Sequence, residues 1–129
     1  MYLIDTNVFL EVLLTQKKRE NCKKFLDDNI GNLYISDFSL HSIGVILFRN
    51  SREDVFQKFV SDIFPNVEIV TLSKWSYEGL VDIKRKLGLD FDDAYQYKIA
   101  KEHDLKIVTM DTDFERITDL SVIFLQNIS

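Results

Sequence analysis

The chain has 129 residues, of which 46% are hydrophobic and 29% charged, with 4 glycines and a single proline. A chain of this length forms one compact domain, and its composition excludes intrinsic disorder, collagen-like repeats and low-complexity linkers. We therefore predict a single folded domain over residues 1–129. The formal net charge of −5 argues against a protein that binds nucleic acid or membranes through a global basic field.

The excess negative charge is confined to one stretch of the chain. Residues 90–119 carry nine acidic and four basic side chains, whereas acidic and basic side chains are equal in number over residues 1–89. The stretch 90–119 is therefore where a site built from carboxylates is expected.

The sequence favours a soluble protein of a reducing compartment. Cys22 is the single cysteine, so no intramolecular disulfide can form. The first residues contain Asp5 and Glu11, which do not fit a signal peptide. No apolar run approaches the roughly 20 residues that a membrane helix requires. We expect a cytoplasmic location and no membrane partner.

Short apolar runs rich in β-branched residues alternate along the chain with longer segments of helical period. This alternation is typical of an α/β protein whose sheet is mainly parallel and covered on both faces. We predict a three-layer α/β/α fold around a central, mainly parallel five-stranded sheet. The expected strands are residues 2–4, 33–36, 67–72, 106–110 and 121–125.

The predicted helices occupy the segments between these strands. They cover residues 7–15, 17–29, 39–49, 51–63, 73–87 and 91–103. Ser51, Ser73 and Asp90 are expected to act as N-caps, because Ser and Asp side chains accept hydrogen bonds from the free amides of a helix start. Gly88 is expected just beyond a helix C-terminus, where a left-handed backbone is common.

Three carboxylates are expected at one edge of the sheet. Asp5 directly follows the first predicted strand, Asp111 follows the fourth, and Asp93 lies in the first turn of the helix that leads into the fourth. In open parallel sheets ligands bind beyond the carboxyl ends of the strands, where the strand order reverses. If the first and fourth strands are neighbours, the three carboxylates converge, and their repulsion requires a cation or raised pKa values.

Carboxylate ligands without Cys or His indicate a hard ion, Mg²⁺ or Mn²⁺. The chemistry expected of such a site is phosphodiester hydrolysis by a metal-activated water. The alternative is that these residues only cap helices and complement helix dipoles, which is the commoner role for each position taken alone.

The opening segment LIDTNVFL, the late segment FDDAYQYKIAKEHDLKIVTMDTDF and the chain length together resemble a PIN domain, the nuclease fold typified by VapC-type toxins. This resemblance implies an Mg²⁺- or Mn²⁺-dependent endoribonuclease that acts on RNA. It also implies a protein that is often a homodimer and is often neutralised by a small antitoxin protein.

Carried over position by position, the resemblance assigns catalytic and metal-binding roles to three residues. These are Asp5, Asp93 and Asp111. Three further positions match accessory residues of the family. These are Asn7, Thr109 and Asp113.

The chain departs from the family at the second acid. The family has a Glu a few residues into the helix after the second strand, but the segment ISDFSLHSIGVIL places Ser42 there, with His41 beside it. Three interpretations remain open. The site works with fewer acidic ligands, His41 or Ser42 holds a water or the substrate, or the protein is a noncatalytic PIN-like module that binds RNA or a protein partner.

Two other α/β families with acidic sites fit less well. Haloacid-dehalogenase phosphatases carry an Asp-x-Asp pair after the first strand, whereas the pair here is Asp111 and Asp113, late in the chain. Receiver domains have paired acids after the first strand, but Thr6 follows Asp5. We therefore retain the nuclease and the binding module as the two candidate functions.

Overall fold

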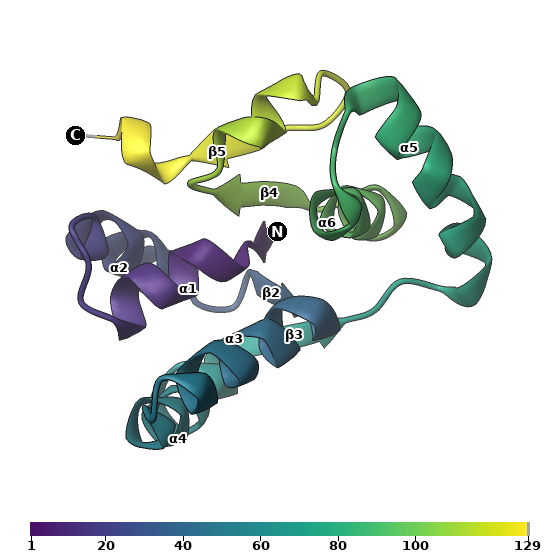
Figure 1. Cartoon of the computed structure of the whole chain (residues 1–129). Coiled ribbons are helices and arrows are strands. Elements are labelled where there is room, and N and C mark those ends of the chain that lie inside the picture. Colours follow the sequence, from purple (N-terminus) through teal and green to yellow (C-terminus); the bar gives the residue numbers. More distant parts are fainter. Residues whose placement is uncertain (129) are drawn as a thin grey trace.

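The computed structural model describes residues 1–128 and contains a five-stranded sheet (Figure 1). The strands are β1 (Tyr2–Ile4), β2 (Leu33–Ser36), β3 (Val67–Val70), β4 (Lys106–Thr109) and β5 (Val122–Phe124). Their order in the sheet is β3-β2-β1-β4-β5, and every neighbouring pair is parallel. The predicted α/β fold with a central parallel sheet is confirmed, and each strand lies within its predicted segment.

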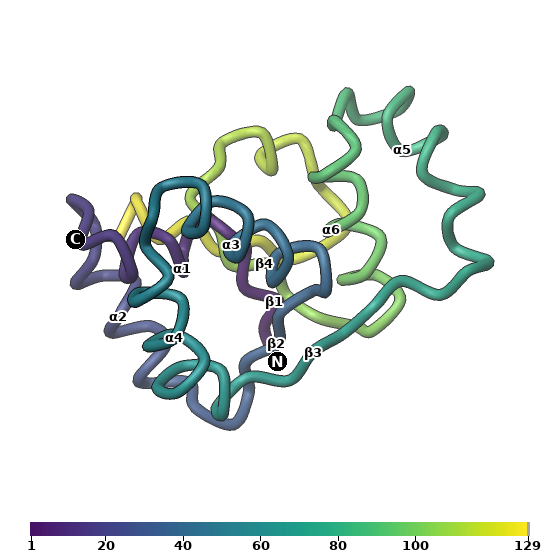
Figure 2. The backbone as a smooth tube through the Cα atoms, turned by 60° about the horizontal axis from the view of Figure 1, so that its bottom comes forward, coloured from purple at the N-terminus to yellow at the C-terminus, as the bar shows by residue number. Residues whose placement is uncertain are grey.

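The helices form one layer on each face of the sheet (Figures 1 and 2). The first layer holds α1 (Thr6–Leu13), α2 (Arg19–Asp28), α3 (Asp37–Arg49) and α4 (Glu53–Asp62), and the second holds α5 (Leu80–Leu87) and α6 (Phe91–His103). The chain moves outward from β1 to β3 and then returns past β1 to β4, so right-handed crossovers place the helices on opposite faces. No helix within residues 1–128 is long and apolar enough to cross a bilayer.

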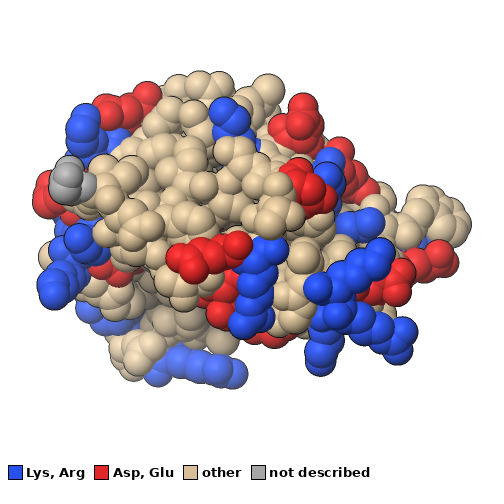
Figure 3. All heavy atoms as spheres, turned by 90° about the horizontal axis from the view of Figure 1, so that it is seen from above, with Lys and Arg blue, Asp and Glu red and all other residues tan. Residues whose placement is uncertain are grey.

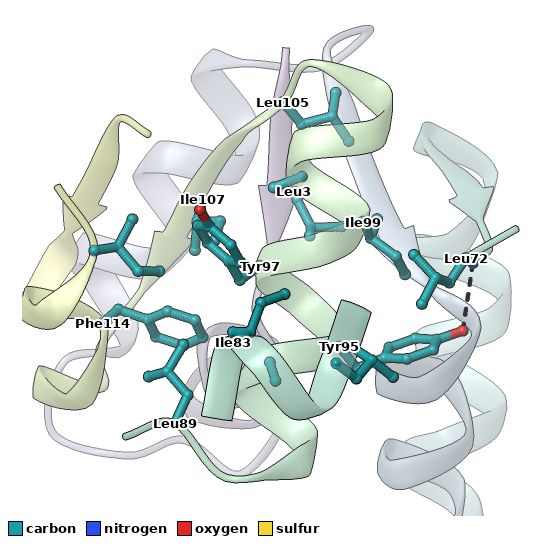
Figure 4. Close-up of a cluster of buried hydrophobic side chains, with 14 of the residues drawn as sticks. Leu3, Leu72, Ile83, Leu89, Tyr95, Tyr97, Ile99, Leu105, Ile107 and Phe114 are labelled. Atoms are coloured by element: carbon teal, nitrogen blue, oxygen red, sulfur yellow. Dashed lines mark hydrogen bonds between the residues drawn. The ribbon is translucent and has the colours of Figure 1, made fainter. Parts of the chain in front are cut away.

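Each face of the sheet packs against its own hydrophobic cluster. Successive strand residues point to opposite faces. Leu3 therefore packs in the cluster under α5 and α6, with Ile99 and Phe114 (Figure 4). Ile4 packs in the cluster under α1 to α4, with Phe9 and Phe59, whose rings meet edge to face at a centroid distance of 5.7 Å. The two clusters hold β1 and β4 firmly in the middle of the sheet.

The start of α6 follows the predicted caps. Gly88 has a φ of +68° after the last residue of α5, in the left-handed region that favours glycine. Asp90 is the N-cap of α6, and its Oδ1 accepts a hydrogen bond from the backbone N of Asp93 at 3.0 Å. This cap fixes Asp93 in the first turn of α6, at the edge of the sheet.

The predicted N-cap Ser51 was wrong. Ser51 has a φ of +55° and its amide bonds back to Phe48, so it ends α3, and α4 begins at Glu53. Ser73 does occupy an N-cap position, but of the 3₁₀ helix η2 (Lys74–Gly79), which runs directly into α5 at Leu80. Its side chain caps no amide, because the hydroxyl donates to the Glu102 carboxylate at 2.6 Å.

Three further 3₁₀ helices complete the part of the chain that the structure describes. They are η1 (Phe64–Asn66), η3 (Thr112–Arg116) and η4 (Leu125–Asn127). Of these, η3 directly follows β4, and it contributes to the site described next.

Candidate metal centre

The strand order reverses between β1 and β4, which are direct parallel neighbours. The carboxyl ends of these two strands therefore form the switch point at which ligands bind in open parallel sheets. Asp5 directly follows β1, and its backbone N donates to the carbonyl of Val108 in β4 at 2.9 Å. Asp111 follows β4, and Asp93 lies at the start of α6. All three predicted acids thus lie at this edge.

Three carboxylates form a cluster here: Asp93, Asp111 and Asp113. Each offers an oxygen that lies within 4.8 Å of the oxygens offered by the other two. Asp111 Oδ1 accepts a hydrogen bond from the backbone N of Asp113 at 2.9 Å, which fixes the turn that presents both side chains. Opposite ligands of Mg²⁺ are about 4.2 Å apart, because each bond is about 2.1 Å long. An oxygen-only cluster of this size is the kind of ligand set that a hard divalent cation takes.

The cluster differs by one residue from the ligand set expected from the sequence, since it contains Asp113 and not Asp5. The carboxylate of Asp5 is 8% exposed and is held by protein donors. Oδ1 accepts from the backbone N of Thr6 at 2.9 Å and from Gln96 Nε2 at 3.3 Å, and Oδ2 accepts from Thr109 Oγ1 at 2.7 Å. Asp5 lies beside the cluster, and its charge contributes to the raised pKa of Asp93.

Two of the predicted accessory residues hold the ends of β1 and β4 together. Thr109 is fully buried, and its Oγ1 donates to Asp5 and accepts from the backbone N of Asp111 at 2.9 Å. Asn7 Oδ1 accepts from the backbone N of Met110 at 3.2 Å. The expected roles of both residues in the reaction stay predictions, but both have a clear positioning geometry.

The helix α3 contributes Ser39 to this network. Ser39 Oγ accepts from Thr6 Oγ1 at 2.8 Å and from Gln96 Nε2 at 2.9 Å. His41 is exposed on the same helix and Ser42 is half-buried. Neither takes part in the hydrogen bonds that surround Asp5, so their expected accessory roles stay predictions.

Sequence reasoning missed Gln96, which links Asp5 to Ser39 and is only 1% exposed. A signal for it was present. Gln96 follows Asp93 by three residues, and residues at that spacing lie on the same face of a helix. A polar residue on the face that carries a candidate catalytic acid is a candidate partner of that site.

The carboxylates of this site repel one another in the absence of a cation. The pKa of Asp93 is raised to about 7, first by burial and then by the charges of Asp90, Asp111, Asp5 and Asp113. The pKa of Asp5 is also raised by burial, against the opposing effect of its hydrogen bonds. A bound cation would relieve this repulsion.

Several solved structures share this fold. FitAcB from Neisseria gonorrhoeae aligns with a TM-score of 0.83 and 21% identity over 99% of this chain and 100% of that chain. A toxin–antitoxin complex from Klebsiella pneumoniae aligns with a TM-score of 0.77 and 22% identity over 97% and 98%. VapC20 from Mycobacterium tuberculosis, described as a sarcin–ricin loop cleaving toxin, aligns with a TM-score of 0.75 and 12% identity over 89% and 93%. At these identities the similarity establishes a common fold.

No curated protein matches the sequence significantly. The sequence model of the PIN domain family, by contrast, matches residues 2–120. This match includes both strands of the switch point and every carboxylate of the cluster. The chain therefore belongs to the PIN domain family.

Proposed function

We propose that this protein is an Mg²⁺- or Mn²⁺-dependent endoribonuclease that hydrolyses phosphodiester bonds of RNA, as the toxin of a toxin–antitoxin pair. The observation that carries the proposal is the cluster of Asp93, Asp111 and Asp113 at the switch point of the sheet. A structural neighbour of the same fold is described as a toxin that cleaves the sarcin–ricin loop. Cleavage of RNA is therefore compatible with this fold.

Asp93, Asp111 and Asp113 would hold the cation, and Asp5 beside them would offer its Oδ2. When bound, the ion would supply an activated water and offset negative charge on the phosphoryl oxygens. In the metal-free protein the pKa of Asp93 is raised to about 7 by burial and by the neighbouring acids. A bound cation would lower this pKa, so Asp93 would serve as an ionised ligand. Thr109 fixes Asp5 and the backbone of Asp111, so the two strand ends keep a constant separation.

Basic groups next to the cluster offer a path for the RNA backbone. Arg116 Nη2 lies 3.9 Å from Asp113 Oδ1, and its Nη1 donates to the carbonyl of Gly88 at 2.6 Å. Gly88 follows the last turn of α5, which contains Lys84, Arg85 and Lys86. Figure 3 shows that Lys and Arg side chains gather on the side of the molecule where α5 lies. Phosphates could therefore run from α5 along Arg116 to the carboxylates.

A cleavage assay tests the proposal. Purified protein is incubated with single-stranded RNA, with Mg²⁺, with Mn²⁺, or with EDTA, and the products are resolved by electrophoresis. We expect cleavage with either ion, loss of cleavage in EDTA, and recovery when the ion is restored. Asp93→Asn serves as the inactive control that excludes a contaminating nuclease.

The second candidate function is a noncatalytic module that binds RNA or a protein partner. It is favoured by Ser42, which stands where the family has a Glu, because one carboxylate fewer weakens cation binding. Retained RNA binding with no cleavage by the wild type in either ion would support this function over the nuclease.

A small antitoxin protein is the partner that we propose for the nuclease. A structural neighbour at 22% identity is described as a toxin–antitoxin complex. We also propose a homodimer, formed through exposed aromatic side chains. Trp75 and Phe91 are 77% and 59% exposed.

The homodimer has a direct test. Phe91 and Tyr77 both contact the ring of Tyr95, at centroid distances of 6.3 and 5.9 Å, so they form one aromatic surface. We expect the wild type to sediment as a dimer and the double variant Trp75→Ser, Phe91→Ser to sediment as a monomer. A wild type that is monomeric at concentrations of about 10⁻⁴ M would contradict a dimer of micromolar or tighter affinity.

A further inference from the structure

We propose that Gln96 is a positioning residue of the metal centre, which holds the carboxylate of Asp5 so that a single oxygen remains open toward a cation. This inference rests on the proposed metal-dependent function. It adds to that function a residue from the same helix that carries Asp93. It also explains how Asp5 keeps a fixed orientation in a site where Ser42 of α3 replaces the family's Glu.

The side-chain amide of Gln96 joins three helices at the switch point. Its Nε2 donates to Asp5 Oδ1 at 3.3 Å and to Ser39 Oγ at 2.9 Å. Asp5 is the N-cap of α1, Ser39 belongs to α3, and Gln96 belongs to α6. A carboxamide nitrogen has two hydrogens, so both are used in these contacts.

Counting acceptor positions shows what these bonds do to Asp5. Each carboxylate oxygen accepts about two hydrogen bonds. Oδ1 already accepts from the backbone N of Thr6 and from Gln96, so it is filled. Oδ2 accepts from Thr109 alone, so it keeps one open position. Gln96 thereby selects Oδ2 as the oxygen that Asp5 can offer to a cation.

The carbonyl oxygen of the Gln96 side chain shows that the hydrogen bond to Asp5 is made at a cost in folding stability. Gln96 Oε1 is buried and has no hydrogen-bond partner among the described residues. An unpaired buried carbonyl costs free energy, which an apolar side chain of the same size would avoid. Rotating the carboxamide by half a turn would not remove the conflict, because it would place Oε1 against the carboxylate of Asp5. The arrangement is therefore understandable if the bond to Asp5 is needed for function.

The hydrogen bonds of Gln96 are also consistent with the absence of the family's Glu from α3. Ser42 occupies the family position of a Glu, and the side chain that α3 directs to the network around Asp5 is the hydroxyl of Ser39. The Ser39 hydroxyl accepts hydrogen bonds from Thr6 and Gln96 and so links these two residues, but it adds no negative charge. In this chain the side-chain amide of Gln96 on α6 therefore makes a fixed contact with Asp5, and no additional carboxylate is involved.

The test measures Mn²⁺ affinity by electron paramagnetic resonance, with Mn²⁺ alone as the probe. Gln96→Met keeps the side-chain size and removes the donor. We expect it to weaken Mn²⁺ binding about tenfold, at the lower end of the effects seen for residues that orient metal ligands. In an Asp5→Asn background, Gln96→Met should weaken binding no further, because Gln96 acts through Asp5.

The matched control is Tyr97→Phe on the same helix. Tyr97 is buried, and its hydroxyl donates to Asp119, away from Asp5. This variant loses one hydrogen bond of α6 and should keep the Mn²⁺ affinity of the wild type. If Gln96→Met does not fold, Gln96→Asn retains the carboxamide but withdraws it by one methylene, and the same weakening is expected.

The outcomes separate this inference from the proposed function. Either of two results overturns the role of Gln96 and leaves the nuclease proposal standing. One is an unchanged Mn²⁺ affinity in folded Gln96→Met. The other is that Gln96→Met weakens Mn²⁺ binding equally in the wild-type and Asp5→Asn backgrounds. Absence of Mn²⁺ binding by the wild type overturns both. Three results together support the positioning role. The Mn²⁺ affinity falls about tenfold in Gln96→Met, it is unchanged in Tyr97→Phe, and it falls no further when Gln96→Met is added to Asp5→Asn.

Discussion

Asp93→Asn is expected to lower the rate of metal-dependent RNA cleavage about a thousandfold, which corresponds to roughly 4 kcal/mol of lost transition-state stabilisation. Asp93 supplies an oxygen of the carboxylate cluster from α6, whereas Asp111 and Asp113 both come from the segment after β4. An Asn side chain keeps the size of Asp93 but removes its negative charge. The cation would then be held from one side of the switch point only. Initial rates on a defined single-stranded RNA in Mn²⁺ measure the effect.

Asp92→Asn is the matched control for this loss. Asp92 is the preceding residue in the first turn of α6 and is exposed, so the substitution makes the same change in net charge outside the cluster. Its cleavage rate should stay within about twofold of the wild type, since single exposed charges have small effects. A thousandfold loss in both variants, or in neither, would contradict a specific role for Asp93.

The same substitution is expected to make the metal-free protein more stable at pH 8, by about 4 kcal/mol. The pKa of Asp93 is raised from an ordinary 3.8 to about 7 in the folded protein, so the folded state retains a proton that the unfolded chain releases. Unfolding is therefore favoured increasingly as the pH rises from about 4 to 7, and the loss persists above 7. Asn cannot ionise, so the variant avoids this loss.

Urea denaturation in EDTA at several pH values measures this gain. It should be full at pH 8 and should vanish at about pH 3, where the folded and unfolded states both carry the proton. Asp82→Asn, which removes an exposed acid from the first turn of α5, is the control for the change in net charge. Addition of Mn²⁺ should reverse the order of stability, because the cation stabilises only the protein that binds it. A gain for Asp93→Asn that is equal at pH 4 and pH 8 would contradict this account.

The fold could be predicted because its strands and the start of α6 follow local sequence patterns that contacts between distant residues do not override. Short apolar runs mark the strands because their residues are covered on both faces, and Asp90 and Gly88 act where their backbone preferences place them. Ser51 has the same capping chemistry but belongs to the turn that ends α3. Ser73 occupies the N-cap position of η2, but its hydroxyl binds the carboxylate of Glu102 and caps no amide. That contact joins segments far apart in the chain and is not visible in sequence.

The location of the site followed from topology, but the closest grouping of its carboxylates did not. Asp5 and Asp111 follow strands that become neighbours, so their meeting at the switch point is a consequence of the strand order. Which carboxylates lie closest together depends on hydrogen bonds between side chains. Thr109 and Gln96 orient Asp5 beside the cluster, and the turn after β4 brings Asp113 toward Asp93. These bonds join residues more than 90 positions apart.

The most direct test of the central claim is an Mn²⁺ titration of the wild type and of Asp111→Asn, followed by electron paramagnetic resonance. Asp111 is the middle residue of the cluster in sequence, and its Oδ1 also fixes the turn that carries Asp113. If the cluster is a metal centre, the wild type binds Mn²⁺, Mg²⁺ displaces it, and Asp111→Asn loses this binding. A wild type that binds no Mn²⁺, or an Asp111→Asn variant that binds it with unchanged affinity, would contradict the account.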